Sequence, residues 1–336
     1  MSPVTLVVQP GISPAASLGA DAGALAAGAL ALRVYEFAGD VLSLGRYHLL
    51  PAGRSGTRVR LHRRHSGGRA TAFGDGFVGI ALTLPHRSAL VSPQPLALAP
   101  EQVMNRCVRG ILEGLKGAGV AAFYPGRDFI TVDRRPLGLV AFEVGPTGAL
   151  LFEAILANRR DFSLLPALLD EVDPGGVVSA EMLAAEAATS LALLGATLPL
   201  DDVATLVRGG YEQVFGLEFE VAHAPAPAPI EEDSWLRQRS PRPELDRHGS
   251  TRTQLGCLEA HFVVDGARIA DIVLAGDFIA NSPAVDELER GLRGSRAERR
   301  VVDEVVARVF ARPENFVLGI GPLETIAETI MRAMPV

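Results

Sequence analysis

The chain has 336 residues, of which 48% are hydrophobic, and its 32 basic and 39 acidic side chains give a formal charge of −7. This length allows a main domain and a smaller one, each with its own core. This overall negative charge argues against a nucleic-acid partner that binds through the net charge of the protein. Any basic site must therefore be local.

Two scarce residue types exclude further classes of protein. The cysteines Cys107 and Cys257 stand far apart and outside any C-x-x-C pattern, which argues against a disulfide scaffold or a cysteine-rich zinc site. Reduced thiols in a cytoplasmic protein are the simplest interpretation. Lys116 is the only lysine, so the chain lacks the lysine of a P-loop and that of a kinase strand.

In chain order, the first part predicts several short strands and one early helix. Asp21 and three glycines interrupt the Ala/Gly-rich stretch 13–32, and no basic segment precedes it. We therefore predict a buried helix over about 21–30 and no membrane span. Alternating or continuous apolar runs predict strands at 4–10, 32–39, 41–50, 58–64 and 78–85.

The middle of the chain predicts a long helix, a hairpin and further helices. Apolar residues at i, i+4 spacing predict a helix from Pro100 to Gly117, with Cys107 on its buried stripe. Helices are expected over most of 161–216, with Ser179 and Asp201 as N-caps. The strands expected here are 120–124, 129–133 and an antiparallel hairpin of 137–144 and 149–156.

A change of composition divides the chain. The alternating Ala and Pro of 224–229 can form neither a helix nor a central strand, so we predict a main domain over 1–221, a linker over 222–242 and a small domain over 243–336. In the small domain we expect a hairpin over 258–279, helices near Pro283 and Ala297, and a last helix from Pro322. Neighbouring hairpins predict an α+β fold with a largely antiparallel sheet.

The segment RRHSGGRA at 63–70 places a glycine pair among arginines. Backbone N–H groups and guanidinium groups could converge there on an anion, and the alternative is an ordinary solvated turn. A second arginine-bearing glycine loop, GRDFITVDRRPLG, follows at 126–138. The seven histidines show no H-x-x-x-H or H-E-x-x-H spacing, so no metal site is predicted.

Together with VLSLGRYHLL at 41–50 and VLAGDFI at 273–279, these loops resemble the lipoate-protein ligase family of the biotin/lipoate ligase superfamily. RRHSGGRA is similar to the family motif R-R-x-[ST]-G-G-[RG]-A, whose loop closes over the acyl chain and the adenylate phosphate. The resemblance spans the chain from about Asp21 onward. It implies a sheet like that of class II aminoacyl-tRNA synthetases, in a catalytic domain followed by a small α+β accessory domain.

Four positions depart from the family pattern. His48 stands where glutamine is usual, and Asp128 and Phe129 replace asparagine and aspartate. The family lysine before the second glycine pair is missing. Alignment through Gly138 places Arg135 at its position, whereas ungapped alignment through Gly126 places Pro136 there. Arginine keeps the charge of lysine but not its geometry.

The resemblance implies a site in which Arg135 takes the catalytic place of the lysine. With Arg63 and Arg134, the arginines of both loops would form an all-arginine anion site, while the hairpin 137–156 lines the acyl tail. The substrate- and nucleotide-binding residues implied are Arg64, Ser66, Gly67, Gly68, Arg69, Gly126, Arg127, Asp128 and Gly138.

The implied reaction activates lipoate or octanoate with ATP, accompanied by Mg²⁺, and transfers the acyl group to a lysine of a lipoyl carrier domain or of a glycine cleavage H-type protein. No nucleic-acid or membrane partner is expected. Two alternatives remain. In the first, the chain is a diverged, non-catalytic protein that binds lipoate or acyl-AMP. In the second, it is an octanoyl or lipoyl transferase that depends on Cys257. A buried structural thiol is, however, the simpler interpretation of that residue.

Overall fold

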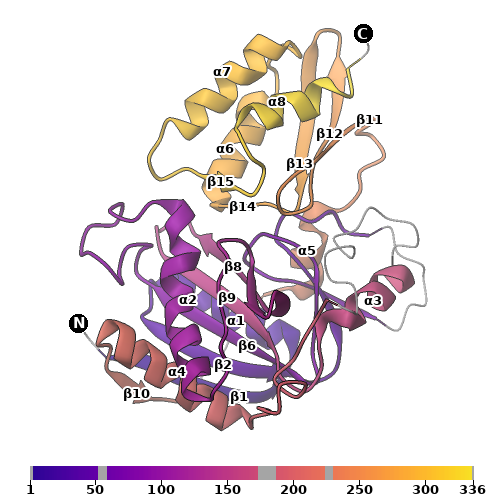
Figure 1. The fold of residues 1–336 in the computed structure, drawn as a ribbon. Coiled ribbons are helices and arrows are strands. Elements are labelled where there is room, and N and C mark those ends of the chain that lie inside the picture. Colours follow the sequence, from indigo (N-terminus) through magenta and orange to yellow (C-terminus); the bar gives the residue numbers. More distant parts are fainter. Residues whose placement is uncertain (1–2, 52–58, 173–186, 224–229, 335–336) are drawn as a thin grey trace.

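The computed structural model describes residues 3–51, 59–172, 187–223 and 230–334. Figure 1 shows a larger body that contains the N-terminal part of the chain and a smaller body, coloured orange to yellow, that contains the C-terminal part. The cap expected at Ser179 and the Ala-Pro spacer lie outside the described residues.

A seven-stranded sheet forms the framework of the larger body. Its strand order is β10-β1-β2-β6-β9-β8-β7; β10, β1 and β2 pair in parallel and the other neighbours pair antiparallel. The prediction of an α+β fold with a largely antiparallel sheet is therefore confirmed. The strands are β1 (Val4–Ile12), β2 (Ala31–Phe37), β6 (Phe77–Leu84), β7 (Phe129–Val132), β8 (Arg135–Val144), β9 (Leu150–Ala157) and β10 (Phe219–Val221).

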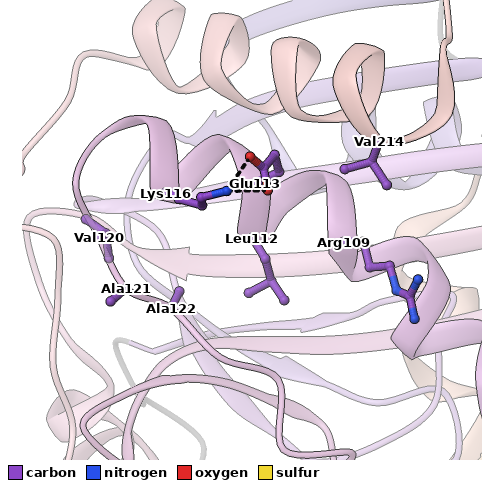
Figure 2. A pocket seen from close by; sticks show the side chains of 8 residues that line it. All are labelled: Arg109, Leu112, Glu113, Lys116, Val120, Ala121, Ala122 and Val214. Atoms are coloured by element: carbon purple, nitrogen blue, oxygen red, sulfur yellow. Dashed lines mark hydrogen bonds and ion pairs between the residues drawn. The ribbon is translucent and has the colours of Figure 1, made fainter.

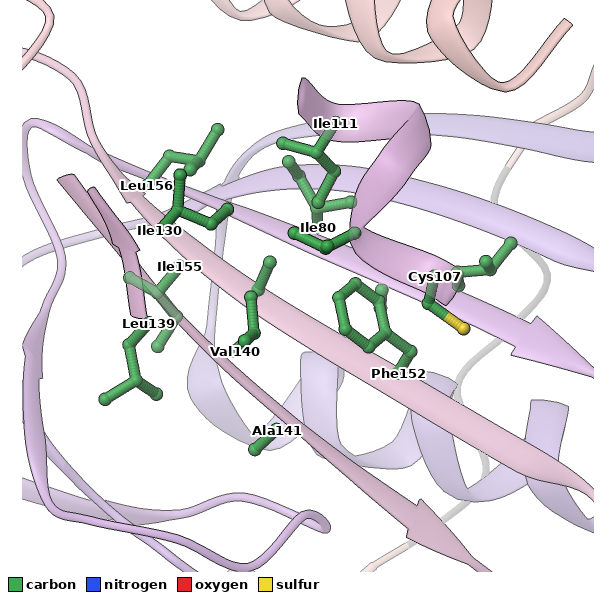
Figure 3. Close-up of a cluster of buried hydrophobic side chains, with 14 of the residues drawn as sticks. Ile80, Cys107, Ile111, Ile130, Leu139, Val140, Ala141, Phe152, Ile155 and Leu156 are labelled. Carbon is green, nitrogen blue, oxygen red and sulfur yellow. The ribbon is translucent and has the colours of Figure 1, made fainter. Parts of the chain in front are cut away.

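One face of this sheet packs on helix α2 (Pro100–Gly117), which α4 (Leu200–Phe215) crosses. Figure 3 shows Cys107 and Ile111 of α2 in one buried cluster with side chains of the central strands. The thiol of Cys107 is thus a core group, as predicted, and burial raises its pKa to about 12. The backbones of α2 and α4 are in contact, because a Cβ atom added to Gly210 would lie only 2.0 Å from the Gly110 carbonyl oxygen.

Helix α1 (Pro14–Ala27) begins earlier than the predicted 21–30. The Ser13 hydroxyl accepts a hydrogen bond from the Ala16 N–H at 3.2 Å, and Pro14 occupies the first turn, where its missing N–H is harmless. Gly28 ends the helix in the left-handed conformation, with φ of 58°. An Ala/Gly-rich stretch has little apolar periodicity, so its caps and not its pattern set the boundaries.

A small second sheet carries the first glycine loop. It has the order β4-β3-β5, and the loop RRHSGGRA connects β4 to β5. Its strands are shorter than the predicted 41–50 and 58–64 because the chain turns after Leu44 and becomes extended only from Arg60 among the described residues. They are β3 (Val41–Leu44), β4 (Arg60–Arg63) and β5 (Thr71–Phe73).

Two further local predictions were wrong. Residues 120–124 form no strand, and only Phe123 makes a bridge, to Thr131. Asp201 does not cap α4, because the helix begins at Leu200 with Pro199 before it. Asp201 lies instead in the first turn, where its negative charge favours the helix N-terminus. Of the expected helical region 161–216, the described part before α4 contains the short helices η1 (Phe162–Leu164) and α3 (Leu165–Val172).

The C-terminal body packs three helices on one face of an antiparallel sheet, as the sequence predicted. Ile326 and Ile330 of the last helix lie in its core. The preceding segments α5 (Glu232–Leu236) and η3 (Arg237–Arg239) fall inside the predicted linker. The other elements are β11 (Arg247–Arg252), β12 (Cys257–Asp265), β13 (Arg268–Gly276), β14 (Ile279–Ala280), α6 (Ser282–Leu292), α7 (Arg299–Phe310), β15 (Val317–Leu318) and α8 (Glu324–Met331).

Candidate functional site

The first glycine loop is shaped from within by Arg64. This buried guanidinium donates to the carbonyl oxygens of Ser43, Gly67 and Arg69 and to the Ser66 hydroxyl, so four of its five N–H groups bind the protein. Burial lowers the pKa of Arg64, although acidic neighbours oppose the effect. Arg64 therefore organises the loop in this structure, and its predicted role with a substrate stays a prediction.

Arg63 is also directed inward. Its side chain, 1% exposed, donates to the backbone carbonyls of Gly45, Arg46, His48 and Leu236. Burial lowers the pKa of this guanidinium to about 9, with the charges of neighbouring arginines adding to the effect. Arg63 thereby joins the loop to β3 and to α5.

A buried ion pair connects the two glycine loops. The guanidinium of Arg69 makes two hydrogen bonds to the carboxylate of Asp128, and the two side chains are 0% and 2% exposed. The Arg69 guanidinium also lies 4.4 Å from the centre of the Phe129 ring. Asp128, which stands where the related motif has asparagine, thus neutralises Arg69 inside the protein.

A carboxylate on the sheet supports the first loop. Glu153 of β9 accepts a hydrogen bond from the backbone N–H of Ser66 at 2.8 Å. Nearby, Asp21 of α1 pairs with Arg33 of β2 at 2.9 Å. Burial raises the pKa of Asp21 to about 7, because desolvation and the charge of Glu153 outweigh the attraction of Arg33. Glu153 was not predicted, yet an acidic residue inside the apolar run ALLFEAIL was a usable signal.

The loop also docks on the C-terminal body. The Gly68 N–H donates to the Phe278 carbonyl at 2.8 Å. Gly67 approaches the same carbonyl so closely that a Cβ would lie 2.2 Å from its oxygen. The Phe278 ring stacks on Tyr47, with centroids 4.5 Å apart. The segment GDF at 276–278 therefore closes directly over the glycine pair.

His48, the residue that replaces the usual glutamine, belongs to the same contact. Its Nε2 lies 2.7 Å from the Asp277 carboxylate, which also accepts the Cys257 N–H at 3.0 Å. Burial alone would raise the pKa of Asp277, but His48 and the hydrogen bonds hold it below its usual value. The histidine thus makes a polar contact between the two bodies.

The second glycine loop exposes two of its three arginines. Arg127 is exposed and donates only weakly, to the Gln254 carbonyl at 3.4 Å. Asp133 and Arg134 form the two-residue turn between β7 and β8 with φ of 50° and 66°, as in a type I′ hairpin. Within the described residues, neither the side chain of Arg134 nor that of the half-buried Arg135 makes a hydrogen bond or ion pair. These cations are available to an anion.

The six arginines therefore do not converge as predicted. Arg63, Arg64 and Arg69 bind protein acceptors, whereas the guanidinium groups of Arg134 and Arg135 bind none in the described part of the chain. Arg135 lies six residues along β8 from Ala141, whose Cβ faces Gly68, and this separation is about 20 Å at 3.3 Å per residue.

The glycines of the second loop have different surroundings. Gly126 adopts a φ of 85° in the open, whereas Gly138 lies in β8, where a Cβ would meet Leu156 at 2.7 Å. Gly138 thus serves close packing of the hairpin. The binding roles of both glycines stay predictions.

Cys257 does not have the environment of a nucleophile. Burial raises the pKa of its thiol, and the charges of Asp277 and Glu259 raise it further. A thiolate is therefore disfavoured, in contrast to reactive cysteines, which lie near cations.

One surface pocket of about 410 Å³ lies beside α2 (Figure 2). It contains Lys116, whose ammonium pairs with Glu113 at 2.9 Å. None of its lining residues belongs to either glycine loop, so the only lysine of the chain lies apart from the predicted site, as the sequence indicated. No helix in the described part of the chain is long and apolar enough to cross a membrane.

Comparisons with known proteins agree with this architecture. Residues 242–319 match the family described as bacterial lipoate protein ligase C-terminus. No curated protein sequence matches the chain significantly. LipL1 of P. falciparum, solved in complex with lipoate, shares 13% identity and a TM-score of 0.74, over 98% of this chain and 100% of that one.

Two further structures match a smaller share of the chain. Lipoate-protein ligase A bound with ATP covers 71% of this chain and 94% of its own, at 16% identity and a TM-score of 0.51. The bi-partite lipoate protein ligase of Thermoplasma acidophilum, described with its E2 lipoyl domain, covers 71% and 91%, at 15% identity and 0.52. The resemblance in the motifs is thus confirmed: this chain has the fold of the lipoate-protein ligases and carries their C-terminal domain.

Proposed function

We propose that this protein is an acyl-protein ligase of the lipoate type, which forms an acyl-adenylate from ATP and lipoate or octanoate and passes the acyl group to a carrier lysine. The observation that carries the proposal is the match to LipL1, which extends over both bodies of the chain and includes the docked C-terminal body. The relatives' bound lipoate and ATP support the two substrates.

In this proposal, the two glycine loops bind different parts of the substrates. The loop of Ser66 to Arg69, tied to Glu153 below and Phe278 above, would cover the acyl group. Arg127, Arg134 and Arg135, whose guanidinium groups pair with no carboxylate among the described residues, would bind the phosphates. Charge aimed at a developing phosphate charge is usually the largest catalytic contribution.

The acceptor in this proposal is a lipoyl domain or a glycine cleavage H-type protein. Support comes from the T. acidophilum ligase, which is described with its E2 lipoyl domain. A carrier lysine that arrives deprotonated attacks the acyl carbonyl carbon, AMP leaves with the bonding electrons, and the attacking nitrogen loses one proton to solvent. No further nucleophile of this chain is required.

The test measures pyrophosphate released from ATP in the presence of lipoate, for the wild type and for variants of Arg135. Arg135→Ala should lower the rate about 100-fold, and Arg135→Lys should restore most of it, because one phosphate-binding donor contributes on that order. Arg109→Ala, at an exposed position beside the pocket of Figure 2, is the matched control and should leave the rate unchanged.

A second candidate function is supported by the Arg69–Asp128 pair. Because this pair and the bonds of Arg64 satisfy the first loop internally, the chain could bind lipoate without turnover. This non-catalytic candidate predicts lipoate binding by calorimetry that is unaffected by Arg135→Ala, with no pyrophosphate released. Pyrophosphate release that requires lipoate would exclude it.

A further inference from the structure

The outward face of the C-terminal sheet holds two histidines and a glutamate side by side. The strands β11 and β12 pair antiparallel, with His248 directly opposite His261 and Glu259 two residues before His261 on the same strand. Residues opposite each other, or two apart along a strand, share one face of a sheet. The backbone register itself therefore brings the three side chains together.

Their ligand atoms already cluster. One nitrogen from each imidazole and one carboxylate oxygen lie within 4.8 Å of one another. The Nε2 of His261 lies 3.0 Å from Glu259 Oε2, and the Nε2 of His248 lies 3.9 Å from Oε1. A tetrahedral zinc ion with bonds of about 2.0–2.1 Å needs ligand atoms about 3.4 Å apart. Small side-chain rotations would reach that spacing.

Two side chains of the cluster are largely buried, and the third is exposed to solvent. The side chains of Glu259 and His261 are 19% exposed, whereas His248 is 51% exposed. The two imidazole rings stack, with centroids 4.4 Å apart and planes at 20°. An ion could therefore enter from the His248 side and keep a solvent ligand in its fourth position, as three-ligand zinc sites do.

Glu259 places one carboxylate oxygen near each imidazole, and the charge of His48 also acts on this carboxylate. An ionised carboxylate with two imidazoles is a donor set suited to borderline divalent metals. His48 also contacts Asp277, so the cluster lies close to the junction between the two bodies.

We propose that His248, Glu259 and His261 form a binding site for a divalent transition metal, with Zn²⁺ as the best-fitting ion. The site is separate from the glycine loops and does not depend on the proposed ligase reaction. Its expected effect is to hold β11 and β12 in register, because an ion that binds only the folded chain stabilises it.

The experiment uses the full, tag-free chain after treatment with a chelator and removal of that chelator. Calorimetric titration with Zn²⁺ should give one ion per chain, and tetrahedral Co²⁺ should give a visible absorption spectrum that Zn²⁺ abolishes. Zn²⁺ should also raise the melting temperature. His248→Gln and His261→Gln should each weaken binding at least about 10-fold, since even second-shell losses weaken metal binding about 10–100-fold.

His223→Gln, at an exposed histidine outside this sheet, is the matched control and should bind as the wild type does. His248 is the more informative target because its exposure makes a folding defect from the substitution small. Affinity unchanged in both His248→Gln and His261→Gln would overturn the proposal, as would the absence of binding by the wild type at about 100 µM Zn²⁺ or Co²⁺.

Discussion

The arginines of the two glycine loops divide into buried residues that organise the protein and exposed residues that can meet a ligand. Arg64 and Arg69 illustrate the first kind, since their guanidinium groups bind carbonyls, a hydroxyl and Asp128. Arg127 and Arg134 illustrate the second. The sequence predicted the positions of these cations but not their directions. For Arg69 the reason is that its acceptor, Asp128, lies 59 residues away in the sequence.

Substitution of Arg69 tests the structural role of the buried pair. Arg69→Met removes one partner and leaves Asp128 charged and buried, which typically costs about 3–5 kcal/mol of unfolding free energy. Urea denaturation at pH 7 measures the loss. Arg127→Ala, at the exposed arginine of the neighbouring loop, should change stability by less than about 0.5 kcal/mol. An equally small effect of Arg69→Met would contradict the assignment.

Glu143 provides a pH test. One of its carboxylate oxygens accepts the Ser282 N–H at 2.9 Å, and the other is buried with no hydrogen-bond partner in the described part of the chain. Burial raises the pKa of Glu143 from 4.5 to about 7, against the charge of Arg46. The folded chain therefore binds more protons than the unfolded chain between these values, and stability falls as pH rises through them, by about 3 kcal/mol.

Glu143→Gln should remove this part of the pH dependence, because glutamine can still accept the Ser282 N–H and carries no charge. Unfolding free energies from urea titrations between pH 5 and 8 measure it. Asp21, whose pKa burial also raises to about 7, leaves a residual slope in the variant. Glu220→Gln, at an exposed strand position, should keep the wild-type slope, and equal slopes in wild type and Glu143→Gln would refute the account.

At the scale of elements, the sequence predicted best where apolar periodicity was strong. The helix from Pro100 and the hairpin of β8 and β9 appear where expected, because their patterns run without interruption. Helix α1 begins earlier in the chain than predicted, because its start depends on the Ser13 cap. The apolar segment 120–124 predicts a strand. Among the described residues, however, its pairing with a neighbouring strand is limited to the single bridge from Phe123 to Thr131.

The contact between the glycine loop and GDF can be tested with one added methyl group. Gly67→Ala would place a Cβ 2.2 Å from the Phe278 carbonyl oxygen and 3.0 Å from the Ile279 Cα. Both are backbone atoms, so the two bodies must separate locally, at a cost of about 1–3 kcal/mol. Thermal unfolding measures this loss.

Trp235 offers a second readout for the same variant, because it is the only tryptophan and its ring lies 4.5 Å from that of His65 in the loop. Its emission should shift in Gly67→Ala. Gly209→Ala is the control: a Cβ there meets nothing within 4 Å, and replacing a helical glycine should stabilise by about 0.5–1 kcal/mol. Unchanged stability and emission in Gly67→Ala would show that the docking is not tight.

At the scale of the whole molecule, the order of motifs predicted the family resemblance, while the closed arrangement of the two bodies was visible only in the structure. The match to LipL1 covers both bodies, whereas two other ligase structures cover 71% of the chain. Contacts such as Tyr47 on Phe278 and His48 on Asp277 connect residues more than two hundred positions apart, so no local pattern reveals them.

The most direct test of the proposed function is the mass of a lipoyl carrier domain after incubation with this protein, ATP, Mg²⁺ and lipoate. The account predicts that one lipoyl group is added to the carrier lysine only when ATP is present, and that the yield falls with Arg135→Ala. A carrier that stays unmodified, under conditions in which a known lipoate-protein ligase modifies it completely, would contradict the proposal of ligase activity.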